Sequence, residues 1–470
     1  MKSGSDILRN NIFQSKLFRL NVTTLAFLGV FVGGVAYASE GSDGASHGFL
    51  STLLFIAIIL LVAKLSSLVE KIGQPSVLGE LVAGIILGNA ALVGINIFDP
   101  IKSDIFIPFL AELGVIILLF QVGLESNIKQ MQKVGLQAFL VAAVGVVVPF
   151  ILGAWIVGPW VLPGLSNTAN LFLGAALTAT SVGITARVFK DLGKIKIPEA
   201  QIVLGAAVID DVIGLIIFAV VSALATLGAV SFGAISWIIA KAILFLVGAI
   251  VVGQFTAPSI GKFFSKINTG VAMKFTLAIV FALVFAFVAG KIGLAPIVGA
   301  FAAGLILDPV HFSYFKKPKA AEDIEVYAKL VNSDNKEQLL NTAKHHNEKH
   351  VEELIEPLAH FFVPIFFVVT GMSVDLKTLA NPKIILVALA ITLVAFVGKY
   401  VAGFAAGKVN KHIVGVGMIP RGEVGLIFAT AGQQLGVISA ELFSVIVIMV
   451  ILTTLITPPI LSSMLKRKTI

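Results

Sequence analysis

The sequence predicts an all-α polytopic membrane protein of about 13 transmembrane helices, arranged as two inverted five-helix repeats with a pair of crossing discontinuous helices. Composition, the spacing of apolar segments and an internal repeat support this fold class. Of the 470 residues, 57% are hydrophobic and only 13% are charged. A soluble domain of this length cannot bury so much apolar surface, whereas successive runs of about 20 apolar residues are what membrane-spanning helices require.

Thirteen apolar segments follow one another from Phe49 onward. They lie near 49–70, 76–96, 106–124, 136–163, 170–190, 198–227, 232–255, 270–291, 293–308, 356–375, 382–409, 412–436 and 440–464. If the chain changes sides after each segment, 21 loop and tail Lys and Arg residues lie on one side and four on the other. By the positive-inside rule, the C-terminus is predicted to be cytoplasmic and the mature N-terminus outside, in the inner (plasma) membrane.

The net charge of +8 is therefore interpreted as a sign of membrane orientation, and no nucleic-acid partner is predicted. Residues 1–38 are predicted to form a signal peptide, because basic residues precede an apolar stretch from Leu20 to Val35, and Ala36-Tyr37-Ala38 then offers a cleavage site. An uncleaved first helix is the alternative. The chain has no cysteine, which excludes disulfides, thiolate metal sites and cysteine nucleophiles.

An internal repeat organises the predicted membrane domain, 49–465. Residues 71–88 align without a gap with residues 291–308 and are identical at eight positions. The repeats extend over about 71–227 and 291–464. Equivalent helices are seven segments apart, so they cross the membrane in opposite directions. Such inverted repeats are typical of alternating-access transporters, whose binding site lies at the midplane between the repeats.

The fourth helix of each repeat is predicted to be discontinuous. Segment 170–190 contains Thr178-Ala179-Thr180-Ser181, and segment 412–436 has Pro420 and Gly422 in mid-span. Both stretches are poor helix formers, and broken helices in such folds cross near the centre. Close packing of small residues is the alternative interpretation.

Two adjacent carboxylates, Asp210 and Asp211, lie in the apolar run 201–230. An ionised side chain at the bilayer centre costs about 2.5–3.5 kcal/mol even on lenient scales, so such residues are candidates for an ion or proton path. Neighbours on a helix point about 100° apart, and the two carboxylates therefore cannot share one task. An aspartate that holds either Na⁺ or a proton suffices for exchange, with Thr178, Thr180 and nearby carbonyls as neutral oxygen ligands.

An ordered set of motifs resembles the monovalent cation:proton antiporter superfamily, and within its second branch the paired-aspartate (NapA-like) sodium/proton antiporters. The motifs are Ile72-Gly73-Gln74-Pro75-Ser76-Val77-Leu78-Gly79-Glu80, Gly123-Leu124-Glu125, Thr178-Ala179-Thr180-Ser181, Asp210-Asp211 and Arg421-Gly422-Glu423. The resemblance covers about residues 50–465. It implies a transporter rather than an enzyme, a thirteen-helix fold, a homodimer, and a dimer domain beside a mobile core domain.

The resemblance also implies roles for single residues. Asp211 matches the aspartate that binds Na⁺ or the proton, and Asp210 matches its partner, which pairs with a lysine of the second repeat. Lys399 lies on the expected helix. No cofactor is predicted beyond the transported ions.

Other polar residues are assigned supporting roles. Arg421 and Glu423 are expected to pair with each other or with a core helix. Glu80 lies near a segment end, where a solvated boundary charge is the default. The stretch 309–356 is predicted to be a cytoplasmic polar loop, and the pair His346 and His350 is interpreted as part of a solvated linker in preference to a metal site or pH sensor.

The predicted function is a secondary antiporter that exchanges a monovalent cation, with Na⁺ favoured, for H⁺. Two alternatives remain open: an electroneutral K⁺/H⁺ antiporter or K⁺ efflux system, and a sodium-coupled organic-anion symporter on a related inverted-repeat fold. The aspartate pair with Lys399 argues against the first alternative.

Overall fold

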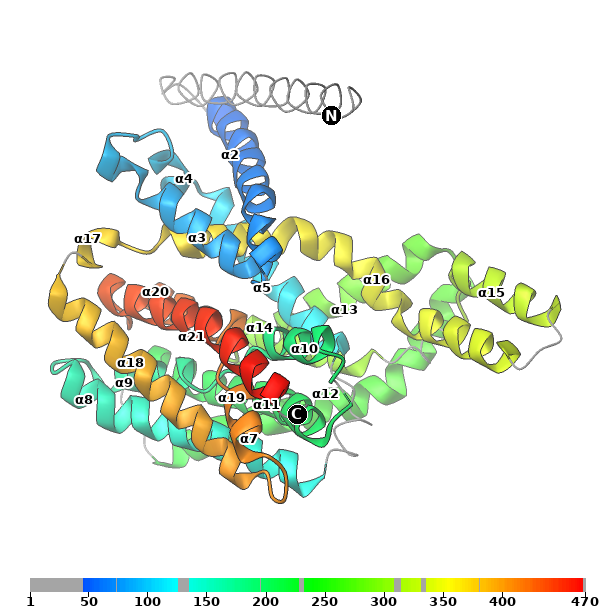
Figure 1. The fold of residues 1–470 in the computed structure, drawn as a ribbon. Coiled ribbons are helices and arrows are strands. Elements are labelled where there is room, and N and C mark those ends of the chain that lie inside the picture. Colours follow the sequence, from blue (N-terminus) through cyan, green and yellow to red (C-terminus); the bar gives the residue numbers. More distant parts are fainter. Residues whose placement is uncertain are drawn as a thin grey trace, which may run out of the picture.

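A computed structural model describes residues 45–467 except 73, 126–134, 195, 228–231, 308–313, 331–334 and 380. The predicted signal peptide, 1–38, lies outside the described residues. Every regular element in the described part of the chain is helical (Figure 1). Eight helices there are long and apolar enough to cross a membrane, and a ninth joins them if Ala240–Gly253 and Pro258–Ser265, bent by 44°, form one span.

Each of the thirteen apolar segments contains helix in the structure. Two of them, α3 and α14, are short apolar helices, and two others are broken in mid-segment. The helices pack into two groups that are continuous within themselves.

The first group consists of six helices that contact one another. They are α2 (Ala45–Ser66), α3 (Ser76–Gly88), α5 (Phe106–Glu125), α13 (Val271–Lys291), α14 (Pro296–Ile306) and α16 (Asn335–Met372). The short elements η1 (Ser67–Ile72), η2 (Ala90–Val93) and α4 (Asp99–Ser103) connect members of this group. Within the group, α3 packs along α16 and α14 packs along α5.

The second group holds the broken helices and the paired aspartates. It consists of α7 (Leu136–Ile151), η3 (Leu152–Val157), α8 (Gly158–Val161), α9 (Asn167–Ala176), α10 (Val182–Asp191), α11 (Pro198–Leu227), α18 (Pro382–Tyr400), η5 (Val401–Ala405), α19 (Lys411–Gly417), α20 (Glu423–Gln434) and α21 (Ala440–Arg467). Two elements connect the groups: α12 (Phe232–Ser265) packs on both α11 and α14, and α17 (Leu376–Leu379) leads from α16 to α18.

Glycines bring the helices of the first group into backbone contact. A Cβ atom built on Gly84 of α3 would lie 2.2 Å from the carbonyl oxygen of Val368 on α16. A Cβ atom on Gly304 of α14 would lie 2.2 Å from the carbonyl oxygen of Phe120 on α5. Both distances are far below van der Waals contact, so these two crossings require residues without a side chain.

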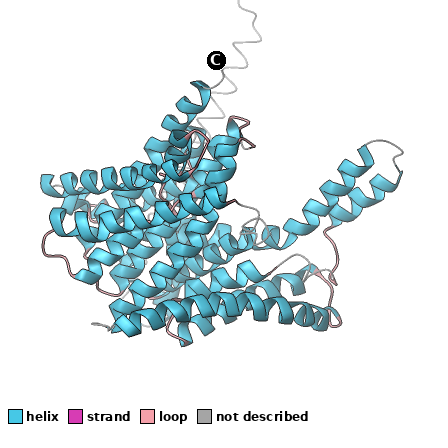
Figure 2. Ribbon diagram, turned by 90° about the horizontal axis from the view of Figure 1, so that it is seen from below, coloured by secondary structure: helices cyan, strands magenta, loops and turns pink. Residues whose placement is uncertain are grey.

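The stretch 309–356, predicted as a cytoplasmic polar loop, is largely helical in its described residues. It forms α15 (Lys319–Leu330) and the first half of α16, a helical hairpin that projects from the bundle (Figures 1 and 2). The physical reason is a stripe of buried apolar side chains where the two helices meet, which the high overall polarity hides. The stripe includes Ala321, Ala328 and Ala343, and further along α16 Val351 and Ile355 pack in one apolar cluster with residues of α5 and α13.

A buried polar contact anchors the base of this hairpin. His350 is 6% exposed, and its Nδ1 lies 2.9 Å from the Nζ of Lys274 on α13, which is 2% exposed. The Lys274 ammonium also donates to the carbonyl oxygen of Lys316 at 3.4 Å. His350 is therefore a packed residue, contrary to the interpretation as part of a solvated linker.

Candidate functional site

The breaks of the two discontinuous segments meet. Between α9 and α10 the chain is extended, and the backbone N–H of Ser181 donates to the carbonyl oxygen of Pro420 at 2.8 Å. Thr185 Oγ1 donates to the carbonyl oxygen of Gly417, the last residue of α19, at 2.7 Å. These bonds satisfy backbone oxygens at the break in the second segment, where Pro420 has no N–H to continue a helix.

Gly422 permits this close crossing. A Cβ atom at Gly422 would lie 2.6 Å from the side chain of Ser181, so any other residue would push the two breaks apart. Four helix ends converge here: the C-termini of α9 and α19 and the N-termini of α10 and α20. Helix ends carry partial charges of opposite sign, so the crossing is a polar point inside an apolar bundle.

Asp210 of α11 is held by two donors and is 1% exposed. Its Oδ2 accepts from Lys399 Nζ at 2.6 Å and from Thr180 Oγ1 at 2.5 Å. The Lys399 side chain is fully buried. The structure thus places α18, the first broken segment and α11 around one buried ion pair, in which the charge of Asp210 is balanced.

Asp211 has a different environment one residue further on. It is 7% exposed, and its Oδ1 has no hydrogen-bond partner within the described residues. The charged groups that act on it are Asp210, Glu423, Glu125 and Lys399. Oδ1 of Asp210 likewise has no hydrogen-bond partner there, so the two residues differ in charge balance: Asp210 is paired with Lys399, whereas Asp211 makes no ion pair within the described residues.

The structure places the remaining predicted ligands at different points of the crossing. Thr180 is bonded to Asp210, whereas Thr178 Oγ1 donates back to the carbonyl oxygen of Ala175 at 2.7 Å. Thr178 is fully buried beside α11, where it lies 3.9 Å from the position of a Cβ atom on Gly214. A hydroxyl that donates to its own helix keeps its lone pairs free to face a cation.

Within the described residues, the side chains of Arg421 and Glu423 contact other groups at the crossing of the two breaks and are not paired with each other. Arg421 is fully buried, and its guanidinium donates to the carbonyl oxygens of Ile419 and Ala395 at 3.3 and 3.2 Å. Glu423 Oε2 accepts from Ser181 Oγ at 3.3 Å. Of the two expected arrangements, the structure shows contact with the core helix α18 for Arg421, since Ala395 belongs to it.

Glu80 lies elsewhere. It is 7% exposed in α3 of the first group, and its charged neighbours are Lys64 and Glu70. The expectation of a solvated boundary charge is wrong in this respect, because Glu80 is buried where α3 packs between α2 and α16.

Sequence reasoning missed three contributors to the site. Ser181 and Thr185 join the two breaks, and both were visible as hydroxyls in the same poor helix-forming stretch. Phe428 of α20 lies beside Gly214 and the Thr178 hydroxyl, with no local sequence signal. No group of three or more His, Cys, Asp or Glu side chains able to hold a metal occurs in the described residues.

An all-helical bundle whose broken helices cross beside a buried aspartate and a neutralised ion pair defines the class of ion-coupled membrane transporters. The sequence matches the family described as "Sodium/hydrogen exchanger, transmembrane" over residues 53–331 and 339–467. The chain belongs to this family, which confirms the family resemblance and identifies a transporter rather than an enzyme.

Relatives of known name agree with this assignment. The chain is 36% identical over 445 residues to the high-affinity Na(+)/H(+) antiporter NhaS3 of Synechocystis sp., covering 87% of this chain and 88% of that protein. It is 33% identical over 414 residues to the Na(+)/H(+)-K(+) antiporter GerN of Bacillus cereus, covering 86% and 94%. The fold is similar to that of the sodium proton antiporter MjNhaP1 from Methanocaldococcus jannaschii, with a TM-score of 0.62, 17% identity and coverage of 88% and 97%.

Proposed function

We propose that this protein exchanges Na⁺ for H⁺ across the membrane and that Asp211 binds either ion in turn. The observation that carries the proposal is the contrast on α11: the charge of Asp210 is balanced by an ion pair with Lys399, whereas the buried Asp211 makes no ion pair within the described residues. A buried carboxylate is costly as a bare anion, so it binds a cation or a proton but not both. Competition at one carboxylate then couples the two fluxes.

The alternating movement is assigned to the two helix groups. The second group carries Asp211 and both breaks, and it would move as a core domain against the first group, which would act as the dimer domain. The separate packing of the two groups supports this division. The homodimer itself is proposed from the family resemblance.

The proposed topology has thirteen membrane crossings and an inverted repeat. The packing of α3 on α16 and of α14 on α5 supports the repeat. Gly84 and Gly304 are equivalent positions in the aligned segments 71–88 and 291–308, and each would clash with a carbonyl at the same distance. The helices that they contact, α16 and α5, are also equivalent in the repeats. The described structure thus supports a pseudo-two-fold axis through this group. The charge asymmetry of the loops supports a cytoplasmic C-terminus in the inner (plasma) membrane.

Na⁺/H⁺ exchange can be tested with purified protein in proteoliposomes that are acidic inside and contain a pH dye. Addition of Na⁺ should dissipate the pH gradient with the unmodified protein. Asp211→Asn should abolish the response, because the amide can neither ionise nor lose a proton. Asp99→Asn is the matched control: it makes the same chemical change at a side chain that is 48% exposed, and should leave exchange intact.

The same vesicles distinguish the alternatives. A response to K⁺ that exceeds the response to Na⁺ would favour K⁺/H⁺ exchange, a candidate because the relative GerN is named for both ions. No response to Na⁺, Li⁺ or K⁺ in folded protein would overturn the exchange proposal and favour the organic-anion symporter. A charge-movement recording separates electrogenic from electroneutral exchange.

A further inference from the structure

Helix α21 carries three buried threonines beside the second break. Thr453, Thr454 and Thr457 are 0%, 4% and 1% exposed. Thr457 follows Thr454 by three residues and Thr453 by four, so the three side chains share one face of the helix. None of the residues predicted for the ion site lies on α21. Buried hydroxyl groups need hydrogen-bond partners, and two of these three find partners in the second break.

Both backbone polar groups of Arg421 are bonded to α21. The hydroxyl of Thr454 donates to the carbonyl oxygen of Arg421 at 2.6 Å, and the backbone N–H of Arg421 donates to Thr453 Oγ1 at 3.4 Å. The first bond is short and the second is longer than usual, so Thr454 supplies most of the attachment. Thr457 Oγ1 donates instead to the carbonyl oxygen of Thr453 at 2.7 Å, within its own helix.

The bond from Thr454 ties the crossing of the two breaks to the long helix beside it. Four carbonyl oxygens of the second break accept hydrogen bonds, those of Gly417, Ile419, Pro420 and Arg421. In that order, the donors are Thr185 Oγ1, the Arg421 guanidinium, the Ser181 backbone N–H and Thr454 Oγ1. The first three donors belong to the two broken segments themselves, whereas Thr454 belongs to α21.

The backbone held by α21 leads directly to the ion site. Gly422, the next residue, makes the close contact with Ser181. Glu423 then begins α20, and its Oε2 accepts from Ser181 Oγ at 3.3 Å. The charge of Glu423 is one of those that act on Asp211. A shift of the Arg421 backbone therefore moves the Glu423 carboxylate relative to Asp211.

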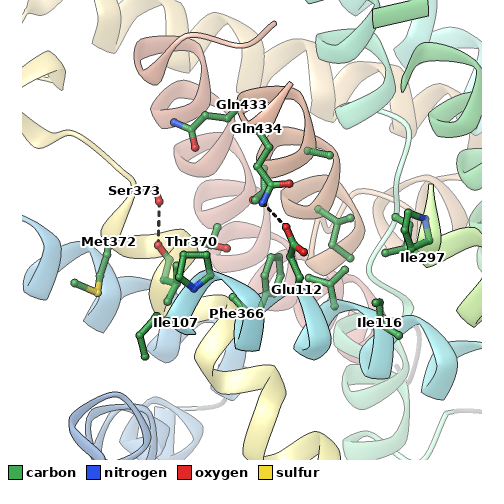
Figure 3. A pocket seen from close by; sticks show the side chains of 18 of the residues that line it. Ile107, Glu112, Ile116, Ile297, Phe366, Thr370, Met372, Ser373, Gln433 and Gln434 are labelled. Carbon is green, nitrogen blue, oxygen red and sulfur yellow. Dashed lines mark hydrogen bonds between the residues drawn. The ribbon is translucent and has the colours of Figure 1, made fainter. Parts of the chain in front are cut away.

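Contacts elsewhere on α20 restrain its position less. At its far end, Gln434 Nε2 donates to Glu112 Oε1 of α5 at 3.5 Å, and Figure 3 shows these two side chains pointing toward each other. This bond is long and exposed, so it restrains the helix little. Between its ends, α20 packs on α9, α11 and α21, and burial of apolar surface has no preferred direction. The directional restraint on α20 therefore lies at its first turn, next to the peptide that Thr454 holds.

We propose that Thr454 is a positioning residue for the ion site. Its hydroxyl fixes the backbone of Arg421, and through it the distance between the Glu423 carboxylate and the cation at Asp211. The inference rests on the proposed function. A carboxylate beside a cation site strengthens binding by Coulomb attraction, which is less screened inside a protein than in water. Without the Thr454 donor, the Arg421 carbonyl is buried and unsatisfied, so the peptide turns toward another donor and the carboxylate moves.

Removal of the hydroxyl tests this role. Thr454→Val keeps the shape of the side chain but loses the donor. In the proteoliposome assay it should raise the half-saturating Na⁺ concentration by about threefold to tenfold, the effect of one hydrogen bond on an equilibrium, with a smaller change in the maximal rate. Thr454→Ser, which keeps the donor, should retain the half-saturation of the unmodified protein.

Thr457→Val is the matched control. It makes the same change on the same face of α21, at a side chain that is also buried, but the lost hydroxyl is bonded within its own helix. Half-saturation and maximal rate should both stay unchanged. A rise in Thr457→Val equal to the rise in Thr454→Val would show that loss of any buried hydroxyl on α21 has this effect, and would overturn the assignment.

A double-mutant cycle tests whether Thr454 acts through Glu423. The Na⁺ concentration for half-maximal thermal stabilisation in detergent reports binding without turnover. In Glu423→Gln protein the charge is already gone, so adding Thr454→Val should change that concentration little, whereas independent sites give additive effects. Additive effects of the two substitutions would contradict the proposal.

A weaker donor at position 454 covers the case in which Thr454→Val does not fold. Thr454→Cys carries a thiol, which donates less strongly than a hydroxyl, and should raise the half-saturating Na⁺ concentration by about twofold. Unchanged half-saturation in the folded variant, with normal exchange by the unmodified protein, would overturn this inference alone. Absence of exchange in the unmodified protein would overturn the proposed function.

Discussion

At the residue scale, two neighbouring aspartates have opposite surroundings. Asp210 is bonded through Oδ2 to Lys399 and Thr180, whereas Asp211 makes no ion pair in the described structure, and the Oδ1 atoms of both residues lack a hydrogen-bond partner there. The sequence predicts that the two carboxylates point in different directions, because adjacent residues on a helix do so. The hydrogen bond from Thr180 to Asp210 forms because the break between α9 and α10 lies against α11. Residue spacing in the sequence does not predict this contact.

Removal of the buried cation should destabilise the protein. In Lys399→Met the apolar stem remains, but Asp210 is left buried without its ion-pair partner. The free energy of unfolding should fall by about 3–5 kcal/mol, the typical effect of breaking a buried pair from one side. Thermal unfolding in detergent, followed by size-exclusion chromatography, measures the loss.

The double variant Asp210→Asn/Lys399→Met is the control for this stability prediction. It removes both charges of the ion pair and should recover much of the lost stability, because neither partner is left buried without the other. A double variant as unstable as Lys399→Met would show that packing of the lysine stem, rather than its charge, stabilises the bundle.

At the element scale, the breaks and the helix crossings differ in how far the sequence predicts them. Pro420, Gly422 and a run of hydroxyls mark the two breaks locally. The stack of Phe218 on Phe428 has no such signal, since the chain has 35 Phe residues and nothing in their spacing tells which rings meet. The hairpin of α15 and α16 has only a weak local signal, because charged residues on its surface outnumber the buried apolar ones between the two helices.

The glycine crossings make matched stability predictions. Gly84→Ala and Gly304→Ala should each lower the free energy of unfolding by about 1–3 kcal/mol, since each new methyl group would displace a helix backbone. Gly248→Ala in α12 is the control, because a Cβ atom there meets nothing within 4 Å, and it should be neutral or stabilising by up to about 1 kcal/mol. Thermal unfolding of the three variants provides the comparison, and equal effects in all three would refute the crossing argument.

The base of the hairpin should loosen in acid. The ammonium group of Lys274 can only donate hydrogen bonds. The Nδ1 of His350 must therefore be unprotonated to accept one from it. Protonation of His350 would place two positive charges 2.9 Å apart, which the nearby Glu353 carboxylate offsets only in part. The contact is therefore present at high pH and lost as His350 becomes protonated.

Hydrogen exchange of α15 at pH 5 and pH 8 measures this effect. We expect faster exchange at pH 5 after correction for the intrinsic pH dependence of exchange, and a loss of the difference in His350→Gln. His346→Gln, at a side chain that is 41% exposed, should retain the difference. A difference that persists in His350→Gln would assign the pH response to another group.

At the scale of the whole molecule, the sequence predicts the class of fold because composition and helix length are set by the membrane. The family resemblance implies two domains, but the segments themselves do not tell which helices belong to each, since every segment is apolar and contacts lipid, protein or both. The groups emerge only from which helices pack together.

Relative movement of the groups should be measurable with spin labels. Val93 and Trp160 are 77% and 83% exposed and lie on the first and second groups, so cysteines there label opposite sides of the interface. The distance distribution between them should shift when Na⁺ replaces H⁺ at the site. A pair at Trp160 and Leu435, both on the second group, should not change. A shift within that pair, or none between the groups, would argue against rigid-body movement.

The pairing of α3 with α16 and of α14 with α5 has a consequence for how the chain is made. Gly84 meets Gly371, which is synthesised 287 residues later. Translation proceeds at about 5–20 residues per second, so α16 is synthesised roughly 15–60 s after α3. During that interval the small-residue face of α3 lies open to lipid or to other nascent chains. We therefore expect this face of α3 to need shielding, by lipid or by another membrane protein, until α16 has been translated.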